Sequence, residues 1–252
     1  MTEMKIGIDL GSRATKIVWV EGTRVVRDEV FDTGHDPMRR ALELLKGLDA
    51  GGVVATGYGR NLAREALGCR TVTEIMAGAR GAREVCPDCE SVVDIGGQDS
   101  KVIELSSEGK AMRFEMNDRC AAGTGRFLEV MARALGYGVE ELGEEALGAG
   151  TAVHINSMCT VFAESEVISL IAQGADRRSI ALGLHQAVAR RVAAMASRVE
   201  LGSKTLFVGG VALNPCMAWT LGEELGTEVI VPERPELTVA LGAALMAWQR
   251  TV

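Results

Sequence analysis

The chain has 252 residues, 47% of them hydrophobic and 24% charged, with 34 acidic and 27 basic residues and a formal net charge of −7. These values are ordinary for a folded globular protein and exclude disordered and fibrous classes. The acidic balance argues against a nucleic-acid partner, which needs a clustered basic face. Because the chain opens without a signal-peptide pattern and has no run of about 18 apolar residues, we expect a cytoplasmic protein with no membrane partner.

The first part of the chain alternates β-rich runs with short turns, which predicts an antiparallel meander of strands at 5–11, 15–22 and 24–31. A helix is predicted over 36–47, with Asp36 as N-cap, Pro37 at the first helical position and Gly47 at its end. A buried strand at 52–56 and a helix at 60–67 are expected to follow.

The same pattern restarts in the second part of the chain, where 91–117 predicts strand, turn, strand, turn and strand. Helices are expected up to about residue 200, followed by a strand and turn at 205–214, a strand at 228–232 and a helix at 236–250. The stretches GIDLGSRATKIVWV and DIGGQDSKVIEL share an Asp, a Gly, a polar residue, a Lys and a β-branched run. An internal duplication of a mixed-sheet α/β domain is the simplest explanation.

Glycine-rich turns follow three of the predicted strands. Two of these strands end on an Asp, and the turns that follow are copies of each other; the residues concerned are Asp9, Gly11 and Ser12, then Asp94, Gly96, Gly97 and Gln98. The third turn contains Gly209 and Gly210. Backbone N–H groups in such turns can surround phosphate oxygens, and a strand-end Asp can hold Mg²⁺ through water. One turn alone is more often a simple hairpin, but three together predict a nucleotide cleft; P-loop and Rossmann motifs are absent from the sequence.

Six cysteines are present, at 69, 86, 89, 120, 159 and 216, and in a cytoplasmic chain we expect buried thiols, metal ligands or redox groups more than disulfides. Cys86 and Cys89 form a C-x-x-C before a strand, so half a zinc site or a redox pair is possible. An incidental surface turn is the preferred interpretation. Cys69 and Cys216 are expected to be packing residues.

Cys120 and Cys159 each lie three residues after an Asn and before an apolar stretch with helical spacing. A single cysteine in this position is more often a small buried residue. A helix N-terminus, however, lowers a thiol pKa from about 8.5 into the range of roughly 3.5 to 7.5. A cubane iron–sulfur cluster and an all-cysteine zinc site each need four cysteines, which two copies of the chain in a symmetric dimer would supply.

Several of these motifs resemble known families. The segments IGIDLGSRATKIVWV, VVDIGGQDSKVIEL and LFVGGVALN resemble the phosphate-1, phosphate-2 and adenosine motifs of the actin, hexokinase and heat-shock-chaperone ATPase superfamily. The segments MNDRCAAGTGRFLEVMA and CTVFAESEVISLIA resemble the activator component of 2-hydroxyacyl-CoA dehydratases, whose family includes the ATPase subunits of benzoyl-CoA reductase. The similarity runs from about residue 5 to 247.

The resemblance implies an α/β fold of two duplicated ribonuclease-H-like (actin-like ATPase) domains with a nucleotide cleft between them. The first domain is expected over 1–90, joined by a C-terminal helix at 236–252. The second is expected over 91–235 and carries Cys120 and Cys159.

The function that the resemblance implies is an ATP-dependent one-electron donor of anaerobic metabolism. It would couple ATP hydrolysis to electron transfer from one [4Fe-4S] cluster that bridges a homodimer through Cys120 and Cys159 of each subunit. Its partners would be a 2-hydroxyacyl-CoA dehydratase-like iron–sulfur enzyme and a ferredoxin or flavodoxin as electron donor. The alternatives are an ATPase for a benzoyl-CoA reductase or a double-cubane cluster protein, a small-molecule kinase of the same fold, and an assembly module with an interfacial zinc ion.

Roles for individual residues follow from this resemblance and from the turns. The first phosphate turn is Gly11, Ser12 and Arg13, with Lys16 as a nearby positive charge. The facing turn is Gly96, Gly97 and Gln98, of which Gln98 is expected to orient the attacking water. Asp9 and Asp94 would hold Mg²⁺ through its water shell, and Gly209, Gly210 and Asn214 would lie near the adenosine.

Overall fold

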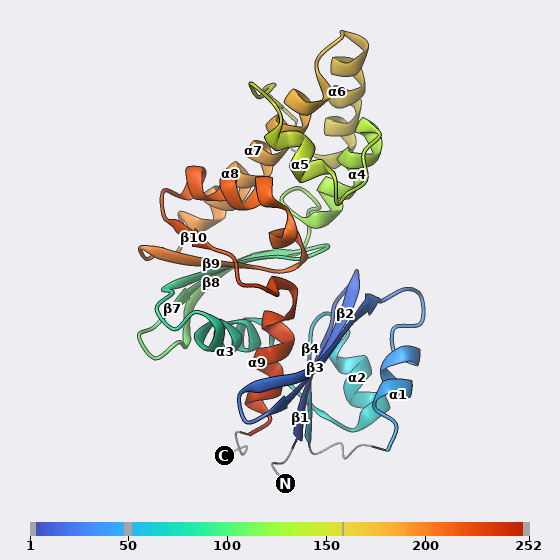
Figure 1. Ribbon diagram of the computed structural model, residues 1–252, viewed down its shortest axis with the longest axis vertical. Coiled ribbons are helices and arrows are strands. Elements are labelled where there is room, and N and C mark those ends of the chain that lie inside the picture. The colour runs from blue at the N-terminus through green and yellow to red at the C-terminus, as the bar shows by residue number, and fades with distance from the viewer. Residues whose placement is uncertain (1–3, 48–51, 158, 249–252) are drawn as a thin grey trace.

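The computed structural model describes residues 4–47, 52–157 and 159–248, and its two mixed sheets have the same strand order (Figure 1). The first runs β3-β2-β1-β4-β5, with bounds β1 Met4–Leu10, β2 Ala14–Glu21, β3 Arg24–Asp32, β4 Val53–Thr56 and β5 Arg70–Thr71. The second runs β8-β7-β6-β9-β10, with bounds β6 Ser91–Ile95, β7 Ser100–Leu105, β8 Ala111–Asn117, β9 Lys204–Val208 and β10 Glu228–Ile230. The expected duplication of a mixed α/β unit is therefore confirmed.

Pairing within the sheets is equivalent in the two copies. β1, β2 and β3 form the predicted antiparallel meander, as do β6, β7 and β8. β4 is parallel to β1 and places Thr56 beside Asp9, while β9 is parallel to β6 and places Val208 beside Asp94. Each strand-end Asp therefore lies at the same topological point, where the carboxyl ends of two parallel strands meet.

Nine α-helices are found in the described residues: α1 Arg39–Leu44, α2 Arg60–Leu67, α3 Glu74–Val85, α4 Gly125–Leu135, α5 Leu142–Leu147, α6 Thr160–Ala172, α7 Arg177–Ala196, α8 Pro215–Leu225 and α9 Thr238–Met246. The α4–α6 group lies at the end of the molecule farthest from the first sheet (Figure 1). No helix among the described residues is long and apolar enough to cross a membrane.

Helices α3 and α9 pack closely together between the two sheets (Figure 1). A Cβ on Gly242 would lie 1.8 Å from the carbonyl oxygen of Ala77, and one on Gly81 would lie 2.0 Å from that of Thr238. Such an approach is possible only for glycine. Since α9 also packs on β1, β2 and β4, the last helix of the chain is part of the layer that covers the first sheet.

Several predicted bounds need correction. The helix predicted over 36–47 begins at Arg39, and its N-cap is Met38, whose side chain makes no capping hydrogen bond, so Asp36 does not cap it. The predicted last helix starts with a 3₁₀ turn at Pro235–Leu237 and continues as α9, and residues 249–252 of the expected segments lie outside the described residues. Residues 210–213 form a 3₁₀ turn before α8.

Candidate functional site

The two predicted phosphate turns face each other, although they follow strands of different sheets. A Cβ on Gly97 would lie 2.6 Å from the Cβ of Arg13 and 3.8 Å from the hydroxyl oxygen of Ser12. A side chain at position 97 would therefore push the turns apart. The tertiary structure thus brings together the residues that the sequence placed at two separate turns.

Each strand-end Asp is paired with a lysine from the neighbouring strand. Lys16 Nζ lies 3.0 Å from Asp9 Oδ2, and Lys101 Nζ lies 3.7 Å from Asp94 Oδ2. Burial raises the pKa of Asp94. Burial alone would lower the pKa of Lys16, but the carboxylate of Asp9 outweighs it and the pKa is raised. The site therefore carries fixed positive charge beside two carboxylates.

Sequence analysis missed the buried charge cluster around Lys101. The Lys101 side chain is 3% exposed, and its ammonium lies 2.8 Å from both Glu74 and Asp99. Glu74 belongs to the first turn of α3, where Thr73 is the N-cap and accepts a hydrogen bond from the Met76 N–H. Burial raises the pKa of Glu74, although Lys101 opposes this. The Thr73 cap is a sequence signal for the helix start, but nothing in the sequence indicates that this helix start meets the second sheet.

Two glycines with positive φ lie against the strand-end carboxylates. Gly57 (φ +91°) and Gly209 (φ +88°) follow β4 and β9, and a Cβ on either would lie within 2.6 Å of Asp9 Oδ1 or Asp94 Oδ1, respectively. The Thr56 hydroxyl beside Asp9 is buried and has no hydrogen-bond partner among the residues that the structure describes. Two carboxylates and an unpartnered hydroxyl form an all-oxygen donor set, which fits the ligand preference of Mg²⁺.

Asn214 is engaged in the fold through both of its side-chain polar atoms. Its Oδ1 accepts from the Met217 N–H at 3.0 Å and caps α8, and its Nδ2 lies 3.0 Å from His185 Nε2. His185 is fully buried, its Nδ1 lies 2.7 Å from the Ala181 carbonyl, and burial lowers its pKa. The placement of Asn214 near an adenosine stays a prediction. Because both polar side-chain atoms are already engaged, Asn214 would contact the adenosine through its backbone.

The second phosphate turn is hydrogen-bonded directly to the start of α4. The N–H of Gly125 donates to the Gly96 carbonyl at 2.9 Å, and that of Arg126 donates to the Gly97 carbonyl at 2.8 Å. Arg13 of the first turn also reaches α4, since its Nε donates to Glu129 at 2.9 Å. Both turns are therefore connected to the helix that follows Cys120.

The loop that carries Cys120 is held by one asparagine. Asn117 Nδ2 donates to the carbonyl oxygens of Cys120 and Ala122 at 2.8 and 3.0 Å, and its Oδ1 accepts from the Cys120 N–H at 3.3 Å. The N-cap of α4 is Thr124, so Cys120 lies in the loop and not at the helix start. Cys120 thus lies near the start of α4, as expected, and is separated from it by a glycine-containing loop.

Cys159 is the N-cap of α6, as expected. The loop before it is held by Glu166 of the same helix, which accepts from the backbone N–H groups of Asn156 and Ser157 at 3.0 and 2.8 Å and from the Asn156 side chain at 2.9 Å. These donors outweigh desolvation and lower the pKa of Glu166 to about 2. The two asparagines of the N-x-x-C pattern therefore have different partners: Asn117 bonds to the backbone of its own cysteine loop, whereas Asn156 bonds to Glu166.

The four free cysteines fall into two classes. Cys120 and Cys159 are exposed, whereas Cys69 and Cys216 are buried in separate hydrophobic clusters, which confirms the latter two as packing residues. Burial raises the pKa of both buried thiols, that of Cys216 to about 12. Since a metal is bound by the thiolate, only Cys120 and Cys159 among the free thiols suit this role.

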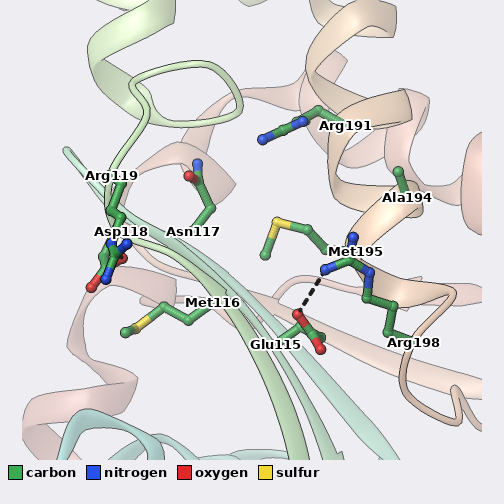
Figure 2. Close-up of a pocket in the computed structure, with 9 residues that line it drawn as sticks. All are labelled: Glu115, Met116, Asn117, Asp118, Arg119, Arg191, Ala194, Met195 and Arg198. Atoms are coloured by element: carbon green, nitrogen blue, oxygen red, sulfur yellow. Dashed lines mark hydrogen bonds and ion pairs between the residues drawn. The ribbon is translucent and has the colours of Figure 1, made fainter.

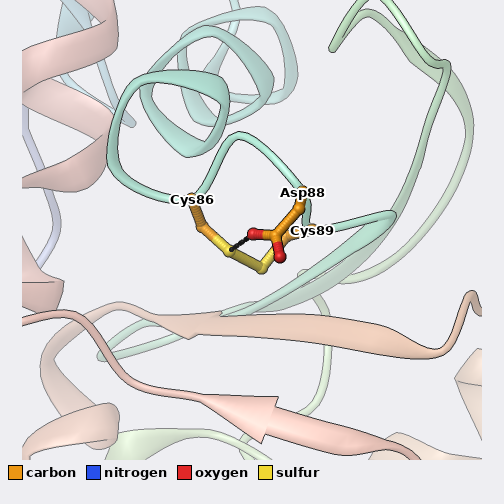
Figure 3. A group of neighbouring side chains, drawn as sticks. All are labelled: Cys86, Asp88 and Cys89. Atoms are coloured by element: carbon orange, nitrogen blue, oxygen red, sulfur yellow. Dashed lines mark hydrogen bonds between the residues drawn. A yellow bond between two sulfur atoms is a disulfide. The ribbon is translucent and has the colours of Figure 1, made fainter.

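Cys86 and Cys89 form a disulfide (Figure 3). Their side chains are 5% and 7% exposed and belong to the cluster between α3 and the second sheet, so both the surface turn and the general expectation against disulfides are wrong for this pair. The Cys89 N–H donates to the Cys86 carbonyl at 3.2 Å, and this tight turn brings the two sulfurs together. Asp88 lies beside them, with Oδ1 3.6 Å from the Cys86 sulfur.

Comparison with known proteins identifies the family. The model of the BadF/BadG/BcrA/BcrD ATPase family matches residues 6–247. The chain is 42% identical to the 2-hydroxyisocaproyl-CoA dehydratase activator of Clostridioides difficile, over 96% of this chain and 94% of the relative. It is 40% identical to the (R)-2-hydroxyglutaryl-CoA dehydratase activating ATPase of Acidaminococcus fermentans, over 99% of each.

A solved structure agrees with these matches over the whole described fold. The activator of the 2-hydroxyisocaproyl-CoA dehydratase from Clostridium difficile with bound ADPNP superposes with a TM-score of 0.90 and 41% identity, covering 97% of this chain and 94% of that chain. The match confirms the expected α/β class with two duplicated ribonuclease-H-like, actin-like halves. The residue bounds of the two domains stay a prediction.

Proposed function

Because the chain belongs to the BadF/BadG/BcrA/BcrD ATPase family, we propose that it hydrolyses ATP to activate a 2-hydroxyacyl-CoA dehydratase-type enzyme by supplying one low-potential electron. The observation that carries this proposal is the direct hydrogen bonding of the Gly96–Gly97 turn to the start of α4, five residues after Cys120. A phosphate-binding turn and a candidate metal ligand are thereby parts of one connected segment.

ATP or ADP with Mg²⁺ would lie where the glycine turns converge. The backbone N–H groups of the turns around Ser12 and Gly97 would surround the β- and γ-phosphates, and Asp9 and Asp94 would hold the water shell of Mg²⁺. Lys16 offsets negative charge at this point, as phosphoryl transfer requires. The Gly209 turn would lie near the adenosine.

Two residues, Gln98 and Glu74, are candidates for positioning the attacking water. Gln98 follows the glycines of the second turn and could orient water through its amide. Glu74 reaches the same region from α3, and its raised pKa makes it a better proton acceptor near neutral pH than an ordinary carboxylate. We propose Gln98 for orientation and Glu74 as the charge that fixes Lys101.

A [4Fe-4S] cluster fits the exposed cysteines if two chains contribute. Each chain offers Cys120 and Cys159 as exposed free thiols, so a homodimer supplies the four that a cubane requires. Val161 and Phe162, in the first turn of α6 after Cys159, are 68% and 67% exposed, and an apolar surface of this kind fits burial against a second copy. When bound, the cluster supplies one-electron chemistry; the chain supplies its thiolates, the start of α6 and the Asn117-held loop.

Coupling between the two sites would pass through α4. Nucleotide binding changes the contacts of the Gly97 turn and of Arg13, and both turns are bonded to α4 residues. A movement of the α4 start therefore moves the Cys120 loop. The proposed partners are a dehydratase-like iron–sulfur enzyme that receives the electron and a ferredoxin or flavodoxin that delivers it.

The decisive experiment is anaerobic purification followed by iron analysis and spectroscopy. We expect a brown homodimer with about four iron atoms per dimer. Cys120→Ser and Cys159→Ser should each remove the iron and leave the affinity for ATP within about twofold. Cys69→Ala, which removes a buried thiol of the hydrophobic cluster beside the first sheet, is the matched control and should keep the iron. A protein that stays colourless after anaerobic cluster reconstitution would refute the proposal.

A further inference from the structure

A hollow of about 370 Å³ opens between the end of β8, the loop that follows it and the last turns of α7 (Figure 2). Three arginines line it, Arg119 from the loop, Arg191 from α7 and Arg198 from just after the end of α7, together with two acidic residues, Glu115 and Asp118. In a chain with a net charge of −7, this local excess of positive charge differs from the charge balance of the molecule as a whole.

The positive charge of the hollow is incompletely neutralised. Arg198 lies 3.4 Å from Glu115, and Arg119 lies 4.0 Å from Asp118 and is 96% exposed. Arg191 has no ion-pair partner among the described residues, and its guanidinium points into the hollow (Figure 2). Its aliphatic stem packs over Gly123, where a Cβ would lie 3.0 Å from Arg191 Cγ. The fold therefore positions this guanidinium, which can donate hydrogen bonds to a carboxylate of another molecule.

The hollow lies next to Cys120. Arg119 is the preceding residue, and Asn117, which also lines the hollow, makes the three hydrogen bonds that hold the Cys120 loop. A protein bound at these arginines would therefore contact the segment that carries a candidate cluster ligand.

The surface beside the hollow has the composition of an interface. Met112, Phe114 and Met116 alternate along β8 and are 63%, 52% and 43% exposed. These side chains form an apolar stripe on the face of β8 that is turned toward α3, whereas Glu115, which pairs with Arg198, lies on the face turned toward α7. Because β8 is the edge strand of its sheet, the stripe and the hollow adjoin at the same sheet edge. Met, Phe and Arg are the residue types enriched at protein interfaces, and exposed arginines favour an acidic partner.

We propose that the arginine hollow and the Met112–Phe114–Met116 stripe form the docking surface for a small acidic electron-carrier protein of the ferredoxin class. This inference rests on the proposed function, because it assigns a place to the electron donor. Acidic side chains of the carrier pair with Arg191 and Arg119, its apolar surface covers the β8 stripe, and opposite charge steers the encounter.

The test measures binding of a purified acidic [4Fe-4S] ferredoxin to the anaerobically purified holoprotein by titration calorimetry at low and high salt. Arg191→Glu and Arg119→Glu should each raise the dissociation constant about fivefold or more at low salt and flatten its salt dependence. Arg24→Glu is the control, since it makes the same charge change at an exposed position of β3, and it should stay within about twofold. Phe114→Ala should weaken binding at both salt concentrations.

Cluster content and reduction by methyl viologen, a small cationic reductant, are measured on the same samples. Unchanged values in the arginine variants, together with lost ferredoxin binding, support the docking surface. Equal effects of Arg191→Glu and Arg24→Glu overturn it, as does loss of the dimer in Arg191→Glu, which would make a second copy the occupant. A holoprotein that contains iron but binds no ferredoxin also overturns this inference alone, whereas a protein without iron refutes the proposed function.

Discussion

Lys101 shows how strongly a single buried charge depends on its partners. Its ammonium contacts Glu74 and Asp99 and lies near Asp94, and these carboxylates raise its pKa although burial by itself would lower it. An uncompensated buried charge is much more costly than an exposed one. The lysine thus offsets part of the effect of burial, which raises the pKa of Glu74 and of Asp94.

Replacement of Lys101 by Met should destabilise the protein by about 3 to 5 kcal/mol, because Glu74 and Asp99 lose the cation that lies 2.8 Å from each of them. Urea unfolding at pH 7 measures the change. Lys110→Met serves as the control, since Lys110 pairs with Glu108 at an exposed position and should change stability by less than about 0.5 kcal/mol. Equal losses of stability in the two variants would contradict the stabilising role of Lys101 in the cluster.

The two candidate water-positioning residues can be separated by kinetics. Gln98→Ala should lower the kcat of ATP hydrolysis by roughly 10- to 100-fold with an almost unchanged ATP affinity, because an orienting contact acts in the transition state. Glu74→Gln should lower both kcat and stability, since it also removes a partner of Lys101. If Gln98→Ala hydrolyses ATP at the normal rate, the role passes to Glu74.

At the scale of elements, α4 and α6 present the two exposed cysteines in different ways. α4 follows the Cys120 loop, donates backbone hydrogen bonds to the Gly96–Gly97 turn and pairs with Arg13 through Glu129. α6 begins after its N-cap Cys159 and supports its own preceding loop through Glu166. The connection of α4 to the turns fits a Cys120 loop that moves when nucleotide binds. The self-supported loop before α6 fits a Cys159 that keeps its position.

Cutting the Arg13–Glu129 pair should weaken the coupling of the nucleotide to the Cys120 loop, while the hydrogen bonds from the start of α4 to the Gly96–Gly97 turn remain. In Glu129→Gln, we expect ATP to bind within about threefold of the normal affinity but to change amide exchange at 118–124 much less than in the original protein. Hydrogen exchange with and without nucleotide is the measurement. Glu145→Gln, which breaks the exposed Arg178–Glu145 pair elsewhere, is the control and should behave as the original protein does.

The lowered pKa of Glu166 should make the stability of the protein depend on pH in the acid range. Its folded-state pKa of about 2 lies below the ordinary value of 4.5, so it contributes stability that is present above pH 4.5 and is lost as the pH falls toward 2. Glu166→Gln should lower stability at pH 7 by about 1 to 2 kcal/mol and should reduce the pH dependence in this window. Unfolding curves between pH 3 and 7 test both statements; an unchanged pH dependence would argue against the loop contacts.

On the scale of the whole molecule, duplication places two equivalent strand ends opposite each other. The sheets have the same strand order, and each strand-end Asp faces a positive-φ glycine from the next parallel strand. The α4–α6 region belongs to the second half of the duplicated fold (Figure 1), and a four-cysteine cluster there would need two further thiols besides the exposed Cys120 and Cys159. Assembly is therefore expected to complete the site.

The exposed apolar start of α6 provides a test of this assembly. Phe162→Asp should dissociate the homodimer and remove the iron, because burying an unpaired carboxylate in the interface is unfavourable. Analytical ultracentrifugation and iron analysis on the same sample measure both effects. Tyr58→Asp is the control at an 83% exposed position away from α6, and it should remain a dimer with its iron.

Much of this organisation was predictable from sequence, because it depends on local patterns. The β-branched runs, the repeated Asp-Gly-Lys pattern and the family resemblance predicted the duplicated sheets and the phosphate turns. The roles assigned to Asp9, Asp94 and the turn glycines remain predictions of this kind, although the fold brings these residues together.

Contacts between distant segments were not predictable. Glu74 and Lys101 are 27 positions apart by their numbers, and their contact depends on how α3 packs between the sheets. The same holds for Arg13 and Glu129. The Cys86–Cys89 disulfide joins near neighbours, but the burial of this turn, which decided against an incidental surface turn, depends on the packing of distant segments. By itself the sequence determined the strands, the turns and the family, since these follow from short-range spacing. Only the tertiary structure decided which charges are buried together, which thiols stay exposed and which helix joins the phosphate turns to Cys120, because those outcomes depend on packing.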